Sequence, residues 1–112
     1  MNFITHNQDD LIRSSGTYLQ GCVTDTSYAT LVATFGEPLK YGFDDSKSDA
    51  EWVIQFDDGT VATIYNWKNG VNYCGDAGTS TTQIREWHIG GYDSDAVTRV
   101  KQALRSICKE VA

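Results

Sequence analysis

The sequence is poor in the features of disulfide frameworks, metal fingers and membrane proteins. Its 3 cysteines are odd in number, far apart, and show neither a CxxC pair nor a Cys/His ligand spacing. No stretch approaches the ~20 consecutive apolar residues of a membrane span. The first ten residues, MNFITHNQDD, lack the basic and apolar regions of a secretory signal. We therefore expect a reduced, cytoplasmic protein without a disulfide framework or a zinc site.

Positive charge is also scarce. The chain has 9 Lys and Arg against 15 Asp and Glu, which gives a formal net charge of −6. Binding to a nucleic-acid duplex needs cations to neutralise phosphates, so this balance argues against it. The acidic residues are interspersed with basic ones, as on an ordinary solvated surface and unlike a DNA mimic. At 112 residues the chain is expected to form a single domain, 1–112.

The strongest local pattern lies in residues 51–68, EWVIQFDDGTVATIYNWK, and it predicts a β-hairpin. Two runs rich in β-branched and aromatic residues flank Asp58-Gly59. This dipeptide supplies the positive φ angles that a two-residue type I′ turn requires. The hairpin is therefore expected to be the best-defined unit of the fold.

A two-residue turn also fixes the register of the hairpin. It places Phe56 opposite Val61 and Trp52 opposite Tyr65, and it makes both faces largely apolar. A hairpin of this kind needs a cover on each side. Helices can cover one side, and a ligand, a second copy of the chain or a protein target is expected on the other.

Shorter patterns predict the remaining elements. Residues 1–15 are an arm or a short helix, and residues 69–83 form a loop of a length typical of functional or mobile loops. The order β-α-β-β-β-α indicates an α+β fold, an antiparallel sheet of about four strands with two helices on one face. The other predicted elements are a strand at 17–24 with a bulge or close approach at Gly21, a helix that starts after Asp25, Thr26 or Ser27 and ends at Gly36, a strand at 84–90, and a helix from Asp93 or Ser94 to about Val111.

Catalytic and metal-binding groupings are weak. Glu86 and His88 lie on one side of a predicted strand, with Asp93 nearby, but the sequence places no nucleophile with them. The histidine is more simply structural. Serine, threonine and cysteine residues fall outside known nucleophile motifs. We therefore expect no enzymatic activity, no catalytic residues, no metal and no cofactor.

Phosphate binding has a modest signal. Gly90-Gly91 precedes a predicted helix and could offer backbone N–H groups to an anion, with charge supplied by Arg85 and Lys68. The same glycine pair is equally explained as a plain turn.

Aromatic residues give the third binding pattern. Trp52, Tyr65, Trp67 and Trp87, with Asn66 among them, could sandwich a purine and bind its edges. The alternative, which the sequence leaves open, is that the tryptophans build the core.

The segments LVATFGEP, EWVIQFDDGTVATIYNWKNG and EWHIGG resemble small phage-encoded counter-defence proteins, and among these the Thoeris anti-defence sponge family, over about residues 27–100. The resemblance implies a small α+β protein that forms dimers or higher oligomers and sequesters cyclic ADP-ribose signals without cleaving them. Some members also hold cyclic oligonucleotides at a separate oligomer site. A phenylalanine and an asparagine bind the signal in that family, and Phe56 and Asn66 match them.

These observations predict a non-catalytic protein of the host bacterial cytoplasm that binds a cyclic nucleotide-type immune signal. The alternative is a protein-binding inhibitor of a host defence complex, such as an anti-CRISPR protein. The expected partners are a small nucleotide signal or a host defence protein, together with further copies of the chain. The candidate ligand-binding residues carry stacking, hydrogen-bonding or cationic side chains: Phe56, Tyr65, Asn66, Trp67, Lys68, Arg85, Trp87 and His88.

Overall fold

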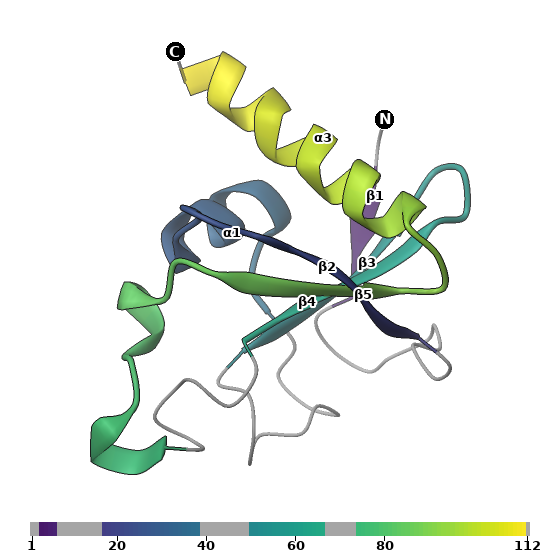
Figure 1. Cartoon of the computed structure of the whole chain (residues 1–112). Coiled ribbons are helices and arrows are strands. Elements are labelled where there is room, and N and C mark those ends of the chain that lie inside the picture. The colour runs from purple at the N-terminus through teal and green to yellow at the C-terminus, as the bar shows by residue number, and fades with distance from the viewer. Residues whose placement is uncertain (1–2, 7–16, 39–49, 67–73, 112) are drawn as a thin grey trace.

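The computed structural model describes residues 3–6, 17–38, 50–66 and 74–111. They form a five-stranded antiparallel sheet with two helices packed on one face, which confirms the predicted α+β class (Figure 1). Among the described residues, no helix has the length and apolar character needed to cross a membrane. The elements are β1 (Phe3–Thr5), β2 (Tyr18–Val23), α1 (Tyr28–Phe35), β3 (Glu51–Phe56), β4 (Val61–Tyr65), the 3-10 turns η1 (Gly75–Ala77) and η2 (Thr81–Gln83), β5 (Trp87–Gly91) and α3 (Asp95–Val111).

The sheet has one strand more than the sequence predicted. Its strand order is β1-β3-β4-β5-β2, so β1 and β2 are the edges. β1 lies in the segment expected to be an arm or a short helix. Phe3 explains the difference, because its ring packs 5.1 Å from the ring of Phe35 and 5.7 Å from that of Phe56. A strand of three residues is too short to show a sequence pattern, so this tertiary contact could not be predicted.

The hairpin between β3 and β4 is present, but its predicted register is wrong by one residue. The N–H of Phe56 donates to the carbonyl of Thr60 at 2.8 Å, and the N–H of Gly59 donates to the carbonyl of Phe56 at 2.9 Å. Within the turn only Gly59 has a positive φ, +89°, so the loop has three residues and ends in a glycine bulge. Trp52 therefore lies opposite Ile64.

This slip corrects the expectation that both faces of the hairpin are apolar, because it changes which side chains share a face. The face against α1 and α3 is almost wholly apolar, and it contributes Trp52, Ile54, Phe56, Ala62 and Ile64 to the core. The opposite face, called the far face below, is mixed, and it carries Glu51, Val53, Gln55, Val61, Thr63 and Tyr65.

Local signals set the ends of α1, at the predicted Gly36 and at Ser27, one of three candidate capping residues with Asp25 and Thr26. The hydroxyl of Ser27 accepts a hydrogen bond from the N–H of Thr30 at 3.1 Å and caps the first turn. Gly36, with φ +84°, ends the helix and donates its N–H to the carbonyl of Val32 at 2.8 Å.

Hydrogen bonds from two tryptophans connect the sheet to the segments on either side of this helix. Trp87 donates its indole N–H to the carbonyl of Thr26, before α1, at 2.9 Å. Trp52 donates its own to the carbonyl of Gly36, after α1, at 2.8 Å. Both side chains are fully buried, and their rings meet edge to face at 5.5 Å. Of the two roles left open by the sequence, the structure gives these tryptophans the core role.

Glycines in β5 and β2 allow α3 to approach the sheet closely. A Cβ on Gly91 would lie 2.4 Å from the Cβ of Ala96 on α3, and one on Gly21 would lie 3.1 Å from Val97. The pairing of β2 with β5 shifts its register between Leu19 and Gly21, which confirms the predicted bulge. Gly90-Gly91 is thus part of β5, which runs from residue 87 to 91 instead of the predicted 84–90.

Candidate functional site

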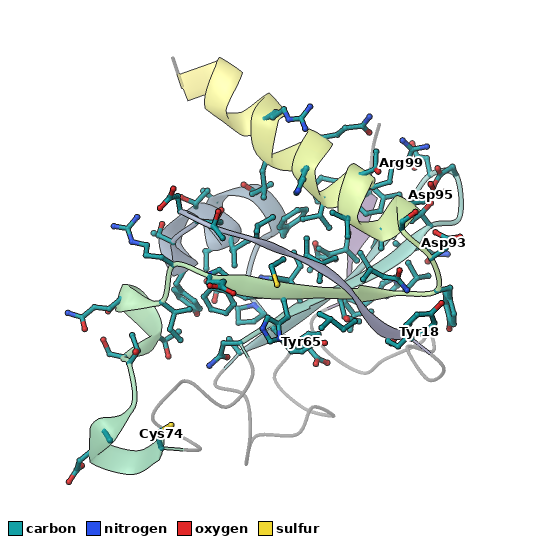
Figure 2. The ribbon with its side chains drawn as sticks, in the orientation of Figure 1. Tyr18, Tyr65, Cys74, Asp93, Asp95 and Arg99 are labelled. Atoms are coloured by element: carbon teal, nitrogen blue, oxygen red, sulfur yellow. The ribbon has the colours of Figure 1, made fainter. Side chains whose placement is uncertain are left out.

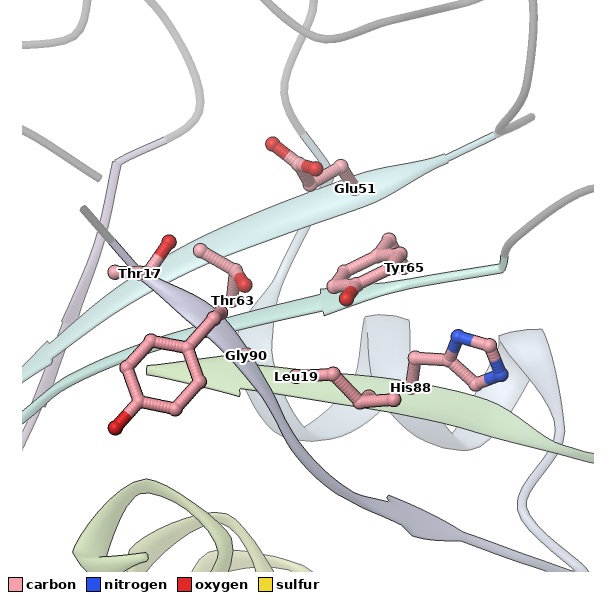
Figure 3. Close-up of a pocket in the computed structure, with 8 residues that line it drawn as sticks. Thr17, Leu19, Glu51, Thr63, Tyr65, His88 and Gly90 are labelled. Carbon is pink, nitrogen blue, oxygen red and sulfur yellow. The ribbon is translucent and has the colours of Figure 1, made fainter. Parts of the chain in front are cut away.

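A pocket of about 390 Å³ opens on the far face of the sheet, away from the helices (Figure 3). In Figure 2, Tyr65 lies on the side of the sheet opposite α3, whereas Arg99 projects from α3 itself. The pocket draws its lining from four strands and the residue before β2: Thr17, Tyr18, Leu19, Glu51, Thr63, Tyr65, His88 and Gly90.

Strand pairing places four chemically active side chains in one line across the sheet. Glu51 of β3 lies opposite Tyr65 of β4, Tyr65 opposite His88 of β5, and His88 opposite Cys22 of β2. Directly opposed residues project from the same face, so these four form a continuous set, called the polar row below. The rings of Tyr65 and His88 meet edge to face with centroids 5.6 Å apart (Figure 3).

The phenol of Tyr65 is held in its neutral form. Burial raises its pKa, and electrostatic interactions with Glu51 and Cys22 raise the pKa further. At neutral pH the hydroxyl therefore keeps its proton and can both donate and accept hydrogen bonds. Its half-buried ring adds an aromatic edge to the pocket.

Thr63, Gly90 and Leu19 line the pocket next to the polar row. Gly90 pairs with Thr63 on one side and with Leu19 on the other. A Cβ on Gly90 would lie 2.5 Å from the hydroxyl oxygen of Thr63 and 3.5 Å from the Tyr65 ring. The missing side chain therefore leaves room between Tyr65 and Leu19 that any larger residue would occupy.

A second cluster lies at the β2 end of the polar row. One ligand atom each from Cys22, Glu86 and His88 lies within 4.8 Å of the other two. The sequence paired Glu86 with His88 but missed Cys22, which is far away in the chain. The β2–β5 pairing brings it opposite His88, a signal available only once the strand order is known.

Of the eight candidate residues from the sequence, the structure brings Tyr65 and His88 together in the pocket. Arg85 is exposed and outside the pocket lining, and Trp67 and Lys68 lie outside the described residues.

The other three candidates lie in the core and present no surface to a ligand. Phe56 is 3% exposed, and Asn66 and Trp87 are 0% exposed. The side-chain oxygen of Asn66 accepts a hydrogen bond from the N–H of Ala50 at 3.2 Å, which gives this buried amide a structural partner. The sequence misplaced these residues because the alternation of side chains along a strand does not show which face of the hairpin the helices cover.

The charge of the pocket distinguishes classes of ligand. Its described lining contains a carboxylate, an imidazole and several hydroxyls, and no Lys or Arg. Such a lining suits rings, hydroxyls and amino groups better than phosphates, which favour cations. Comparisons of the chain with protein-family models, with curated proteins and with solved structures found no match.

Proposed function

We propose that this protein binds a small nucleotide-type signal without cleaving it, and that the far-face pocket holds the nucleoside part of that signal. The observation that supports the proposal most directly is the pocket of about 390 Å³ beside the Tyr65 ring. Ligand sites are typically concave, lined by apolar and aromatic surface, with a few polar groups that fix orientation.

The lining offers a partner for each part of a nucleoside. The rings of Tyr65 and Tyr18 and the side chain of Leu19 provide apolar surface for a base. The Glu51 carboxylate accepts hydrogen bonds from ribose hydroxyls or an exocyclic amino group, and the Thr63 hydroxyl can donate as well as accept.

The proposed ligand class combines this chemistry with the family resemblance. Cyclic ADP-ribose isomers contain an adenine, two riboses and a diphosphate. The described pocket serves the first two groups, so the proposal assigns no phosphate contact to it. Sequestration requires only binding groups, and these are what the pocket supplies.

The test is a binding and release experiment on the purified full-length chain. The protein is incubated separately with cyclic ADP-ribose isomers, linear ADP-ribose, adenosine and cyclic oligonucleotides, freed of unbound ligand, and heated. We expect chromatography of the released material to show an intact cyclic ADP-ribose isomer. Release of cleaved products would show that the protein is an enzyme and would contradict sequestration. Retention of no nucleotide would overturn the proposal and favour the protein-binding inhibitor.

Matched tyrosine variants assign the binding to this pocket. Ligand at a hundredfold its Kd should stabilise the native protein by ~2.7 kcal/mol and raise its melting temperature by several degrees. Tyr65→Ala should abolish this shift, and Tyr65→Phe should keep most of it because the ring remains. Tyr92→Ala is the control, since Tyr92 is 47% exposed and lies outside the pocket lining. Equal losses in Tyr65→Ala and Tyr92→Ala would contradict the assignment.

A further inference from the structure

The cluster of Cys22, Glu86 and His88 joins the three side-chain types that bind zinc most readily in proteins. A thiol, a carboxylate and an imidazole suit a borderline-soft divalent ion such as Zn²⁺. The three contributing atoms come from β2, from β5 and from the residue before β5, and each lies within 4.8 Å of the others.

The backbone holds two of the three groups in place. Cys22 and His88 are directly opposed in the antiparallel β2–β5 pair, so their side chains leave the same face of the sheet at adjacent positions. Glu86 is exposed, two residues before His88, and its side chain can adjust without disturbing the core. Among the described residues, no side-chain hydrogen bond or ion pair engages the Cys22 thiol, the Glu86 carboxylate or the His88 imidazole.

The separations fit convergence on one ion. With zinc bonds of about 2.0 to 2.3 Å, tetrahedral ligand atoms lie roughly 3.3 to 3.8 Å apart. The observed limit of 4.8 Å exceeds this, so binding of the ion would draw the thiol and the exposed carboxylate closer together.

The same compactness argues against a cysteine nucleophile with a histidine base. In such a triad the imidazole uses its two nitrogens on opposite sides, one toward the thiol and one toward the carboxylate. Thiol and carboxylate would then be about 7 Å apart across the ring. Here both lie within 4.8 Å of each other as well as of the histidine, so the three groups point to a common centre.

We propose that Cys22, Glu86 and His88 form a Zn²⁺ site with three protein ligands and a fourth coordination position open to water or an added ligand. A thiolate and a carboxylate balance the charge of the ion. His88 also lines the far-face pocket, so the zinc would bind at the edge of that pocket. The proposal is independent of the nucleotide-binding function, because its ligands and its tests involve metal alone.

Metal stoichiometry on the purified full-length chain tests the site. After incubation with zinc chloride and dialysis, elemental analysis should find one zinc per chain. Cys22→Ser and His88→Gln should each lose the bound zinc, and Glu86→Gln should weaken binding by at least tenfold, consistent with loss of one of three ligands. The double variant Cys74→Ser/Cys108→Ser is the matched control and should retain one zinc. Retention by Cys22→Ser, or loss in the control, would overturn the assignment.

Two measurements on the unmutated chain guard against misfolded variants. Cobalt chloride should give a thiolate-to-cobalt charge-transfer band together with the intense visible bands of tetrahedral Co²⁺, and zinc should abolish both. Zinc should also slow iodoacetamide alkylation of Cys22, mapped by peptide mass spectrometry, by at least tenfold while leaving the exposed Cys74 unaffected. Unchanged Cys22 alkylation, or octahedral cobalt spectra, would refute the site.

Discussion

Asp58, in the hairpin turn, links stability to acid pH. Hydrogen bonds from the side chain and the backbone N–H of Thr60 are the main causes that lower its pKa, and Arg99 at 2.9 Å adds to them, giving a pKa of about 2 against an ordinary 3.8. Because the folded-state pKa is lowered, the stabilisation is complete above pH 3.8 and disappears as pH falls toward 2.

Asp58→Asn should therefore flatten the acid limb of the stability profile between about pH 4 and pH 2, with a small effect at pH 7 because the ion pair is partly exposed. Urea midpoints measured across this range test the prediction. Asp57→Asn, at the neighbouring exposed carboxylate, is the control. An acid limb in Asp58→Asn that matches the unmutated chain would contradict it.

Thr5, in the edge strand β1, carries a buried hydroxyl group. Its oxygen is buried and, in the part of the chain that the structure describes, has no hydrogen-bond partner. Thr5→Val replaces that hydroxyl with a methyl group of similar size, so it should raise the free energy of unfolding by about 1 kcal/mol. Thr5→Ser keeps the hydroxyl and removes the methyl, and should lower it. Urea unfolding of both variants measures the difference, and a destabilised Thr5→Val would show that the hydroxyl is satisfied.

The packing of α3 on β5 depends on a pair of small residues. A Cβ on Gly91 would lie 2.4 Å from that of Ala96, so Gly91→Ala should cost about 1 to 3 kcal/mol of stability through overpacking. Ala96→Gly should also destabilise, by about 1 kcal/mol, because glycine lowers helix propensity.

The double variant tests whether the two residues act on each other. Removing the Ala96 methyl makes room for the new one, so Gly91→Ala/Ala96→Gly should be more stable than the sum of the single effects. Denaturant unfolding of the four proteins gives this coupling energy directly. Strict additivity would mean that Gly91→Ala destabilises through another contact, such as the Val61 carbonyl 3.1 Å from its Cβ.

Local signals in the sequence were sufficient for most of the elements. Capping residues act at short range, so the sequence predicted the end of α1 at Gly36 and narrowed its start to Asp25, Thr26 or Ser27, of which the structure selects Ser27. The register of the hairpin was not predictable, because Asp58-Gly59 fits both a two-residue turn and a three-residue turn with a glycine bulge. That ambiguity paired Tyr65 with Trp52 and so placed it on the wrong hairpin face. Cys22 was missed for a separate reason, because its position opposite His88 depends on the order of the strands in the sheet.

At the scale of the whole molecule, the two sheet edges differ in what they expose. The edge strand β2 presents Tyr18 and Leu19, which are 63% and 53% exposed, beside the pocket that they line. Edge strands pair readily with other chains. The earlier reason for self-association, a hairpin apolar on both faces, no longer holds, so the expectation now rests on this edge.

We expect a dimer or higher oligomer that associates through β2, with Leu19→Lys shifting it toward monomer. Ile4→Lys, at the 62% exposed position on the opposite edge β1, is the matched control and should leave the mass unchanged. Light scattering after size-exclusion chromatography at tens of micromolar protein measures the mass. A monomer for the unmutated chain would contradict the prediction.

The indole hydrogen bonds at the two ends of α1 have an optical consequence. Trp52 and Trp87 are both sealed from water and fastened to the segments on either side of the helix. Any event that separates α1 from the sheet must expose both indole rings to water. This exposure would shift their fluorescence to longer wavelength and allow iodide to quench it. In a Trp67→Phe background, these two residues would serve as built-in fluorophores for following helix detachment during ligand binding, assembly or unfolding, without an added dye.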